Sequence, residues 1–174
     1  MPKKPTKWGV KVWVCSDAET AYIHSFEVYT GKSDLGTEHG LAYNVVMHLL
    51  QELLDSGRAV YTDNFYSSPE LFQDLYSNGV YECGTVRGNK FLPRSILPAA
   101  MALSKGDTVF KRCGPLTFGR WLDERDVLVR STIHRDTLET IERRGPDGQP
   151  ETVRKPKIVM DYNRFMSGVD EQIN

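Results

Sequence analysis

The spacing of apolar residues changes along this chain, and this change constrains its fold more than any other feature. In residues 10–14 valines alternate with Lys11 and Trp13, and residues 21–31 repeat that period of two after a short turn. A period of two predicts β-strands, so we expect a hairpin here. In residues 41–54 the apolar side chains fall at steps of four instead, which predicts a helix packed on a sheet.

A second strand and helix follow in "AVYTDNFYSSPELF", residues 59–72. Residues 59–62 predict a strand, and Ser67 or Ser68 with the following proline predicts a helix N-terminus. That helix is expected to stop at Gly79, before another strand that leads into "GTVRGNK". The first 90 residues thus predict the order β, β, α, β, α, β, a mixed sheet covered by helices of the α/β class.

Residues 91–156 have a different character, because six prolines interrupt them and helical spacing is poor. Short antiparallel strands are expected there, with turns at Cys113–Pro115 and Asp123–Asp126. We interpret the segment as a β-rich insertion. After it, Ile158–Met160 is expected to form a short strand, followed by a helix or loop.

The net charge of −1 conceals a strong segregation of charge. Residues 17–82 carry 11 acidic against 2 basic side chains, whereas residues 87–120 carry 7 basic side chains against one acidic. A basic block beside an acidic body suits a polyanion such as DNA. A charge block is equally often a solvated face, and both interpretations remain open at this point.

Composition excludes several classes of protein. A length of 174 residues fits one domain, or one domain with an inserted piece. No run approaches the roughly 20 apolar residues of a membrane span, so no membrane partner is expected. Cys15, Cys83 and Cys113 lack C-x-x-C spacing, which argues against a disulfide framework or a zinc site and favours an intracellular, reducing compartment.

Motifs for nucleophilic catalysis and for nucleotide binding are lacking in the sequence. There is no G-x-S-x-G elbow and no Walker loop. The four histidines show no metal-ligand spacing, and we interpret each as structural: His24, His39, His48 and His134.

Two carboxylates remain as candidates for chemistry. Asp63 ends the strand at residues 59–62, where it either bonds its own backbone to shape the loop or holds a metal ion. Asp170 lies in "MSGVDEQ". Carboxylates at such positions suit Mg²⁺, which prefers oxygen ligands, and two such ions assist phosphodiester cleavage. Spacing alone does not join the two, because 107 positions separate them.

The series "VYTDNFYSSPELFQDL", "GTVRGNK", "WLDERDVLVRSTIH" and "VMDYNRFMSGVD" resembles the piggyBac family of transposases, including its domesticated derivatives. The match runs in order across nearly the whole chain. The resemblance implies an IS4-like DDE/DDD catalytic domain with a retroviral-integrase-like (RNase H-like) fold. It places this core at residues 1–90 and 157–174 and the β-rich insertion at residues 91–156.

In that family three aspartates bind two divalent metal ions, Mg²⁺ or Mn²⁺, and drive DNA cleavage, hairpin formation and joining to TTAA targets. By resemblance Asp63 is the second of these aspartates and Asp170 the third. The resemblance also implies nuclear localisation, a possible homodimer, and four cations that face DNA: Arg87, Lys90, Lys111 and Arg112.

The departures from the family pattern set further expectations. The family's first aspartate lies on a strand upstream of the segment that matches residues 1–9, Asp17 does not replace it, and Ile173 stands where the family tends to have another Asp. We therefore expect a core without its N-terminal strand, cut from a larger domain and inactive alone. Two alternatives are a domesticated DNA-binding or structural protein without catalysis, and an unrelated Mg²⁺-dependent phosphodiesterase.

Overall fold

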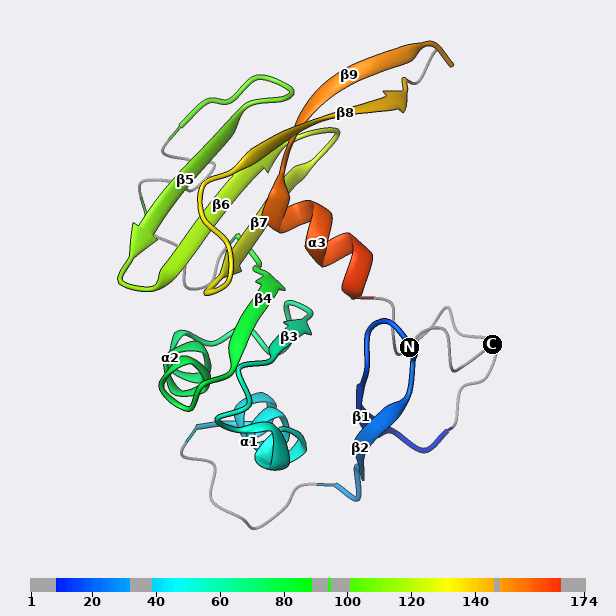
Figure 1. The fold of residues 1–174 in the computed structure, drawn as a ribbon, viewed down its shortest axis with the longest axis vertical. Coiled ribbons are helices and arrows are strands. Elements are labelled where there is room, and N and C mark those ends of the chain that lie inside the picture. Colours follow the sequence, from blue (N-terminus) through cyan, green and yellow to red (C-terminus); the bar gives the residue numbers. More distant parts are fainter. Residues whose placement is uncertain (1–8, 32–38, 89–93, 95–100, 146–147, 167–174) are drawn as a thin grey trace. The chain divides into compact units, whose positions relative to one another are not determined.

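The structure is a computed structural model that describes residues 9–31, 39–88, 94, 101–145 and 148–166 (Figure 1). The chain forms two compact units, one of residues 1–52 with 167–174 and the other of residues 53–166. Each unit is considered by itself below. Among the helices of the described ranges, none has the length and apolar character needed to span a bilayer.

The first unit contains the predicted hairpin and the first predicted helix. Strands β1 (Val12–Ser16) and β2 (Ile23–Val28) pair antiparallel. Asp17 Oδ1 stabilises the turn by accepting from the backbone N–H groups of Glu19 and Thr20. Helix α1 (Leu41–Leu49) follows, and Ser25 Oγ on β2 donates to the Leu49 carbonyl at 2.7 Å. These predictions are confirmed, although α1 is shorter than the apolar stripe and gives way to a 3₁₀ turn, η1 (Gln51–Leu53).

The second unit is built on a five-stranded mixed sheet. Its strand order is β3-β4-β7-β6-β5, with β3 and β4 parallel and the remaining neighbours antiparallel. The strands are β3 (Ala59–Thr62), β4 (Tyr81–Thr85), β5 (Thr108–Cys113), β6 (Leu116–Leu122) and β7 (Asp126–Ser131). Both predicted turns, at residues 113–115 and 123–126, connect neighbouring strands. The separate domain boundaries at residues 90 and 157 stay a prediction, and β5 to β7 continue the sheet of β3 and β4.

Helix α2 (Pro69–Ser77) joins the two parallel strands. Ser68 is its N-cap and accepts from the Leu71 N–H at 3.4 Å, with Pro69 at the first helical position. The helix stops at Asn78 and Gly79, whose φ of 64° suits glycine. The helix predicted from these start and stop residues is confirmed.

The predicted strand at Ile158–Met160 is wrong. Strands β8 (Leu138–Arg144) and β9 (Pro150–Pro156) form an antiparallel ribbon, and helix α3 (Lys157–Phe165) starts directly after β9. Its buried residues Ile158, Val159 and Tyr162 have helical spacing. A run of three apolar residues does not discriminate a strand from a helix, and the face that α3 buries against the sheet decides the outcome.

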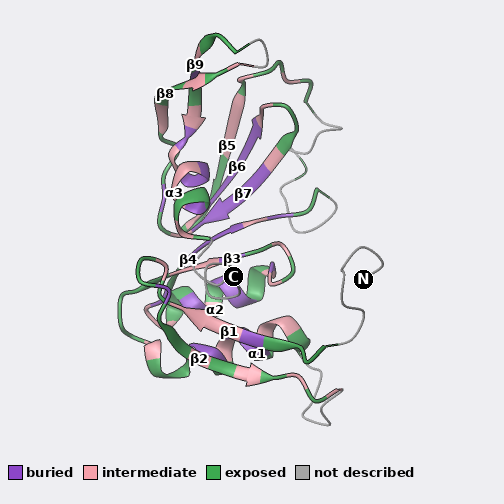
Figure 2. Cartoon of the chain, turned by 90° about the vertical axis from the view of Figure 1, so that its right-hand side faces the viewer, coloured by how far each residue is buried: buried purple, intermediate pink, exposed green. Residues whose placement is uncertain are grey.

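The two faces of the five-stranded sheet are covered by different helices. On the first, called the α3 face, Cys83, Trp121 and Val129 pack with Ile158, Val159 and Tyr162 of α3 in one hydrophobic cluster. On the second, called the α2 face, the alternate residues Glu82 and Arg130 are fully buried. The Arg130 guanidinium lies over the Phe72 ring of α2, 3.1 Å from its centre. Figure 2 shows β6 and β7 buried along most of their length, as expected for strands covered on both faces.

Gly84 makes room for a polar contact on the α2 face. Thr62 Oγ1 on β3 donates to Glu82 Oε1 on β4. A Cβ atom at Gly84 would come within 2.8 Å of both of these oxygens. Glycine is therefore required where the two strands bring this pair together.

Candidate metal and nucleic-acid site

Asp63 lies immediately after β3, at the carboxyl end of the parallel pair. Its Oδ1 accepts from the backbone N–H of Phe65 at 2.7 Å, and its carbonyl accepts from the Tyr66 N–H at 3.3 Å. The residue is exposed, and within the described ranges its second carboxylate oxygen has no hydrogen-bond partner. Asp63 therefore shapes the loop with one oxygen and presents the other to solvent, so the two interpretations of this residue are compatible.

Arg87 connects the loops that follow the two parallel strands. It comes two residues after β4, and its Nε donates to Asn64 Oδ1 at 2.7 Å. Asn64 is the neighbour of Asp63. The carboxyl ends of parallel strands are a usual place for ligands in α/β sheets. The carboxylate of Asp63 and the loop that carries Arg87 therefore both lie at the carboxyl end of the parallel strands β3 and β4.

The negative charge of Asp63 contributes to the raised pKa values of two tyrosine hydroxyls, Tyr66 and Tyr162. Burial, and to a lesser degree the carboxylate of Asp63, raises the pKa of Tyr66 to about 12. The pKa of Tyr162 is also raised, first by burial and to a lesser degree by Asp63, while the Thr85 hydroxyl 3.5 Å away acts in the opposite direction. Both phenols are neutral near pH 7, so they can donate hydrogen bonds but add no negative charge.

Helix α3 crosses the α3 face from β4 to β3. The Cys83 thiol donates to the Ile158 carbonyl at 3.7 Å, and burial holds the pKa of that thiol far above its ordinary value. Near the other end of the helix, the ring of Phe165 lies 5.1 Å from the ring of Tyr61, centre to centre. Tyr61 stands two residues before Asp63. The helix thus ends beside the strand that carries the candidate carboxylate.

The remaining predicted site residues fall into two groups. Asp170 and Lys90 lie outside the described residues. Lys111 and Arg112 are exposed on β5, the strand at the opposite edge of the sheet from β3. Four strand spacings of about 4.8 Å place that edge roughly 19 Å from β3. The structure therefore does not bring Lys111 and Arg112 beside Asp63.

Part of the basic block has structural partners. Lys105 pairs with Glu124 at 2.6 Å, and the buried Arg120 bonds Asp126 at 2.7 Å and the Met101 carbonyl at 2.7 Å. These two cations hold loops and strands of the second unit. The other described cations of the block are exposed: Arg87, Arg94, Lys111 and Arg112.

The described residues do not by themselves complete a metal site. Across residues 9–31, 39–88, 94, 101–145 and 148–166, no three His, Cys, Asp or Glu side chains come together in a group that could hold an ion. Asp63 supplies one suitable oxygen ligand. A metal site that includes Asp63 would take its further ligands from outside the described ranges.

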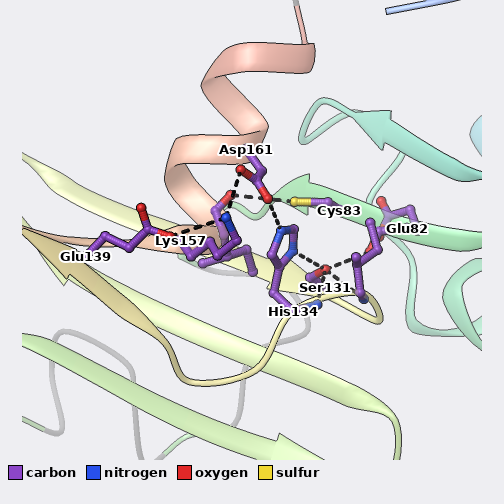
Figure 3. A network of polar contacts seen from close by, with 9 residues as sticks. Glu82, Cys83, Ser131, His134, Glu139, Lys157 and Asp161 are labelled. Atoms are coloured by element: carbon purple, nitrogen blue, oxygen red, sulfur yellow. Dashed lines mark hydrogen bonds and ion pairs between the residues drawn. The ribbon is translucent and has the colours of Figure 1, made fainter.

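A polar network at the far end of β7 was missed by the sequence analysis, which assigned His134 only a structural role. His134 Nδ1 lies 2.9 Å from Ser131 Oγ, and His134 Nε2 lies 2.7 Å from Asp161 Oδ2 (Figure 3). The same three residue types form a hydrolase triad, but there Nε2 of the imidazole faces Ser and Nδ1 faces Asp, the reverse of the arrangement here. Ser131, however, is fully buried, and its Oγ also accepts from the N–H groups of Ile133 and His134, so no substrate reaches it. No sequence signal joined His134 to Asp161, 27 positions later.

Comparisons with known proteins agree on one family. The family described as Transposase IS4 matches residues 1–174. Human PiggyBac transposable element-derived protein 3 is 30% identical over 180 residues, which cover 96% of this chain and 30% of that protein. The human Chimeric ERCC6-PGBD3 protein is also 30% identical, over 96% of this chain and 17% of its own length.

A comparison with solved structures also finds a piggyBac transposase. A chain in the cryo-EM structure of the piggyBac transposase synaptic complex with hairpin DNA superposes with a TM-score of 0.82 at 26% identity. The match covers 99% of this chain and 35% of the other. The present chain thus spans about a third or less of the length of these relatives. It belongs to the piggyBac family of transposases, within the Transposase IS4 group, and has its RNase H-like α/β fold.

Proposed function

We propose that this chain is part of the catalytic domain of a piggyBac-type DNA transposase, with Asp63 and Asp170 as two of its metal-binding carboxylates. The observation that carries the proposal is the position of Asp63. This residue is exposed at the carboxyl end of β3 with one oxygen open, and helix α3, which precedes Asp170 in the sequence, ends beside the same strand.

The pairing of the two carboxylates is proposed from the resemblance to the family. Asp170 lies outside the described residues, four positions after Met166 in the sequence. Among the described residues, Asp63 supplies the exposed carboxylate of the pair.

The chemistry proposed for the site is that of divalent metal ions. Carboxylate oxygens suit Mg²⁺ and Mn²⁺, and the open oxygen of Asp63 offers such a ligand. When bound, two such ions stabilise the attacking and leaving oxygens of phosphodiester cleavage and strand transfer. The part played by this chain is to hold Asp63 at a fixed place through its contact with the Phe65 N–H.

DNA is the proposed partner. The solved relative is a synaptic complex with hairpin DNA. In this chain Arg87 lies beside the Asp63 loop, and Lys111 and Arg112 are exposed on β5. We propose that these residues and Lys90 contact the phosphate backbone, which carries no sequence information. A TTAA target, a homodimer and a nuclear location are parts of the same proposal.

The 174-residue polypeptide is proposed to be inactive in DNA cleavage by itself. By resemblance it holds two of three metal-binding aspartates, and a pair of ions needs negative charge from several sides. A second candidate function is DNA binding or a structural role without catalysis. The human relative is a transposable element-derived protein, which favours that candidate.

Metal binding tests the proposal directly. Mn²⁺ affinity of the 174-residue protein, followed by electron paramagnetic resonance, is expected to fall in Asp63→Asn and in Asp170→Asn. Glu19→Gln, which changes an exposed carboxylate on the β1–β2 turn, serves as the matched control and should bind Mn²⁺ normally. Equal binding by the wild type and both Asp variants would contradict the metal site.

A nicking assay tests the incompleteness of the site. No Mn²⁺-dependent cleavage of DNA by this polypeptide is expected. Cleavage by the wild type that is lost in Asp63→Ala would show that two of the three carboxylates suffice.

A further inference from the structure

We propose that Phe65 stacks on an unpaired DNA base, while Arg87, beside the same loop, holds the phosphate backbone. The inference rests on the DNA-binding part of the proposed function and needs no metal ion. The residues that carry it lie in the loop between β3 and α2 and just after β4, all in the second unit (Figure 1).

Phe65 exposes a large apolar ring. The residue is 47% exposed, whereas the other phenylalanines that the structure describes in this unit are buried or half-buried: Phe72, Phe110, Phe118 and Phe165. Tyr76 and Tyr81 are exposed to a similar degree, but their rings lie against each other, 5.9 Å apart between centres. A single exposed apolar side chain is common on protein surfaces, so the loop that holds Phe65 and the charge beside it decide what the ring can bind.

Hydrogen bonds fix this loop to the sheet on both sides of Phe65. The Phe65 N–H donates to Asp63 Oδ1 at 2.7 Å, and the Tyr66 N–H donates to the Asp63 carbonyl at 3.3 Å. Ser67 Oγ then donates to the Thr85 carbonyl, at the end of β4, at 2.6 Å. A side chain on a backbone that is already ordered loses less conformational entropy when a ligand binds, so the loop is preorganised.

Tyr66 fixes the orientation of the Phe65 ring. The two ring centres are 5.1 Å apart, and the ring planes stand at 88° to each other, an edge-to-face arrangement. Tyr66 itself is half-buried and belongs to the wall of the unit. Phe65 keeps its exposure of 47% in the presence of this contact. The ring is therefore both oriented and accessible.

Arg87 supplies positive charge at the same loop. Its Nε donates at 2.7 Å to the side-chain oxygen of Asn64, the residue before Phe65, and Arg87 is exposed. An amide partner orients the guanidinium without neutralising its charge, as a carboxylate would. A guanidinium held in this way suits a phosphate group, to which it can donate two parallel hydrogen bonds.

An apolar ring and a cation on one rigid loop match the two chemical parts of a nucleotide. The base stacks on the aromatic ring, and the phosphate pairs with the cation. Inside a DNA duplex the faces of each base are covered by its neighbours, so the ring can stack only on a base that has left the helix. Since every base has a π-face, the expected ligand is DNA with unpaired bases, without preference for their sequence.

Two DNA probes that differ in one feature test the proposal. Both are duplexes of the same length with identical ends, and both have 2-aminopurine at the centre. In one probe the central bases are paired, and in the other they are mismatched. Binding of the 174-residue protein is followed by the fluorescence anisotropy of an end label, and stacking by the change in 2-aminopurine fluorescence.

Phe65→Ala is expected to weaken binding to the mismatched probe by about tenfold, and to change binding to the paired probe by less than about twofold. Phe65→Trp should keep the affinity and the 2-aminopurine signal, because an indole also stacks. Phe65→Leu should behave like Phe65→Ala, and it keeps an apolar side chain in case Phe65→Ala disturbs the loop. Arg87→Gln should weaken binding to both probes equally, since both contain the phosphate backbone.

Tyr81→Ala is the matched control. Tyr81 is an aromatic residue with 39% exposure at the start of β4, the opposite end of that strand from Arg87. This variant should bind both probes as the wild type does and give the same 2-aminopurine signal. A loss of binding to the mismatched probe as large as that of Phe65→Ala would overturn a specific role for Phe65.

The remaining outcomes separate this inference from the proposed function. Equal losses of Phe65→Ala on the two probes, or its normal binding to the mismatched probe, overturn the stacking role and leave DNA as the partner. A changed oligomeric state of Phe65→Ala with normal DNA binding also overturns it and assigns the ring to a protein interface. Failure of the wild type to bind either probe overturns the proposed DNA partner, and the stacking role with it.

Discussion

The two faces of the five-stranded sheet each contain a pair of ionisable residues, and the pairs differ in how they are satisfied. On the α3 face, His134 and Asp161 are joined by a 2.7 Å bond, and the carboxylate is 24% exposed. On the α2 face, Glu82 and Arg130 have no exposed surface. Glu82 Oε2 and the three guanidinium nitrogens of Arg130 make no hydrogen bond to any residue that the structure describes.

The two pairs therefore differ in effect: one forms a short hydrogen bond to a helix, and in the other burial shifts the pKa values of both residues. The His134–Asp161 bond is short and joins the segment after β7 to helix α3. For Glu82, burial raises the pKa to about 8, although Arg130 and the Thr62 hydroxyl act in the opposite direction. Burial also lowers the pKa of Arg130. Burial therefore disfavours the charged form of each of these two residues, and replacement of the pair by apolar residues is expected to be tolerated.

The largest expected effect on stability comes from a substitution that removes one member of the α2-face pair, Glu82 or Arg130. At pH 9, above the raised pKa of about 8, Glu82→Leu leaves the Arg130 charge buried without a counter-ion, and we expect a loss of about 3–5 kcal/mol in the free energy of unfolding, measured by urea titration. Arg130→Leu should cost less, because Glu82 can take up a proton. The double variant should recover most of the loss. A double variant that is as unstable as Glu82→Leu would contradict the account of this face.

A somewhat smaller effect is expected from the apolar part of the α3 face. Ile158→Ala removes a fully buried side chain from the core cluster and should cost about 2–5 kcal/mol in urea unfolding. Ile133→Ala is the matched control, because Ile133 is 39% exposed and should change stability by well under 1 kcal/mol. Similar losses in the two variants would mean that α3 is not held by this cluster.

The pH dependence of stability sharpens the comparison further. Between the ordinary pKa of 4.5 and the raised value of about 8, the folded state keeps a proton on Glu82 that the unfolded chain releases. The contribution of Glu82 to the free energy of unfolding is therefore fully present below pH 4.5 and is lost as the pH rises through about 8. Unfolding measured across this window should show a decline in the wild type that is absent in Glu82→Gln. Parallel profiles would show that Glu82 is ionised in the fold.

The smallest effects concern the exposed cations. Lys111→Gln, on the edge strand β5, should lower the salt dependence of DNA binding by about one unit of slope without a change in sequence preference. Arg87→Gln should do the same and also loosen the Asn64 contact at the Asp63 loop. Fluorescence anisotropy at several salt concentrations measures both. Lys157→Gln, which changes a cation on α3 outside the proposed surface, is the control, and equal slopes in all four proteins would exclude these residues from the DNA interface.

The sequence predicted the local elements better than their pairing. The hairpin of residues 12–28, helix α2 with its Ser68 cap and the position of Asp63 follow from spacing and from strong start and stop residues. Helix α3 was mistaken for a strand at residues 158–160, since its helical form depends on burial against the sheet. Pairs such as Glu82 with Arg130 and His134 with Asp161 are distant in the sequence, and only the folded sheet brings each together.

The central claim is the proposal that Asp63 and Asp170 bind the same metal ion. Anomalous scattering from crystals of the 174-residue protein soaked in Mn²⁺ tests it most directly. The account predicts a peak roughly 2–2.5 Å from carboxylate oxygens of both Asp63 and Asp170, at ordinary metal–oxygen distances. Its loss in Asp63→Asn crystals would complete the proof. A Mn²⁺ peak that contacts neither aspartate, or crystals in which the two carboxylates are held apart without a shared ion, would contradict the account.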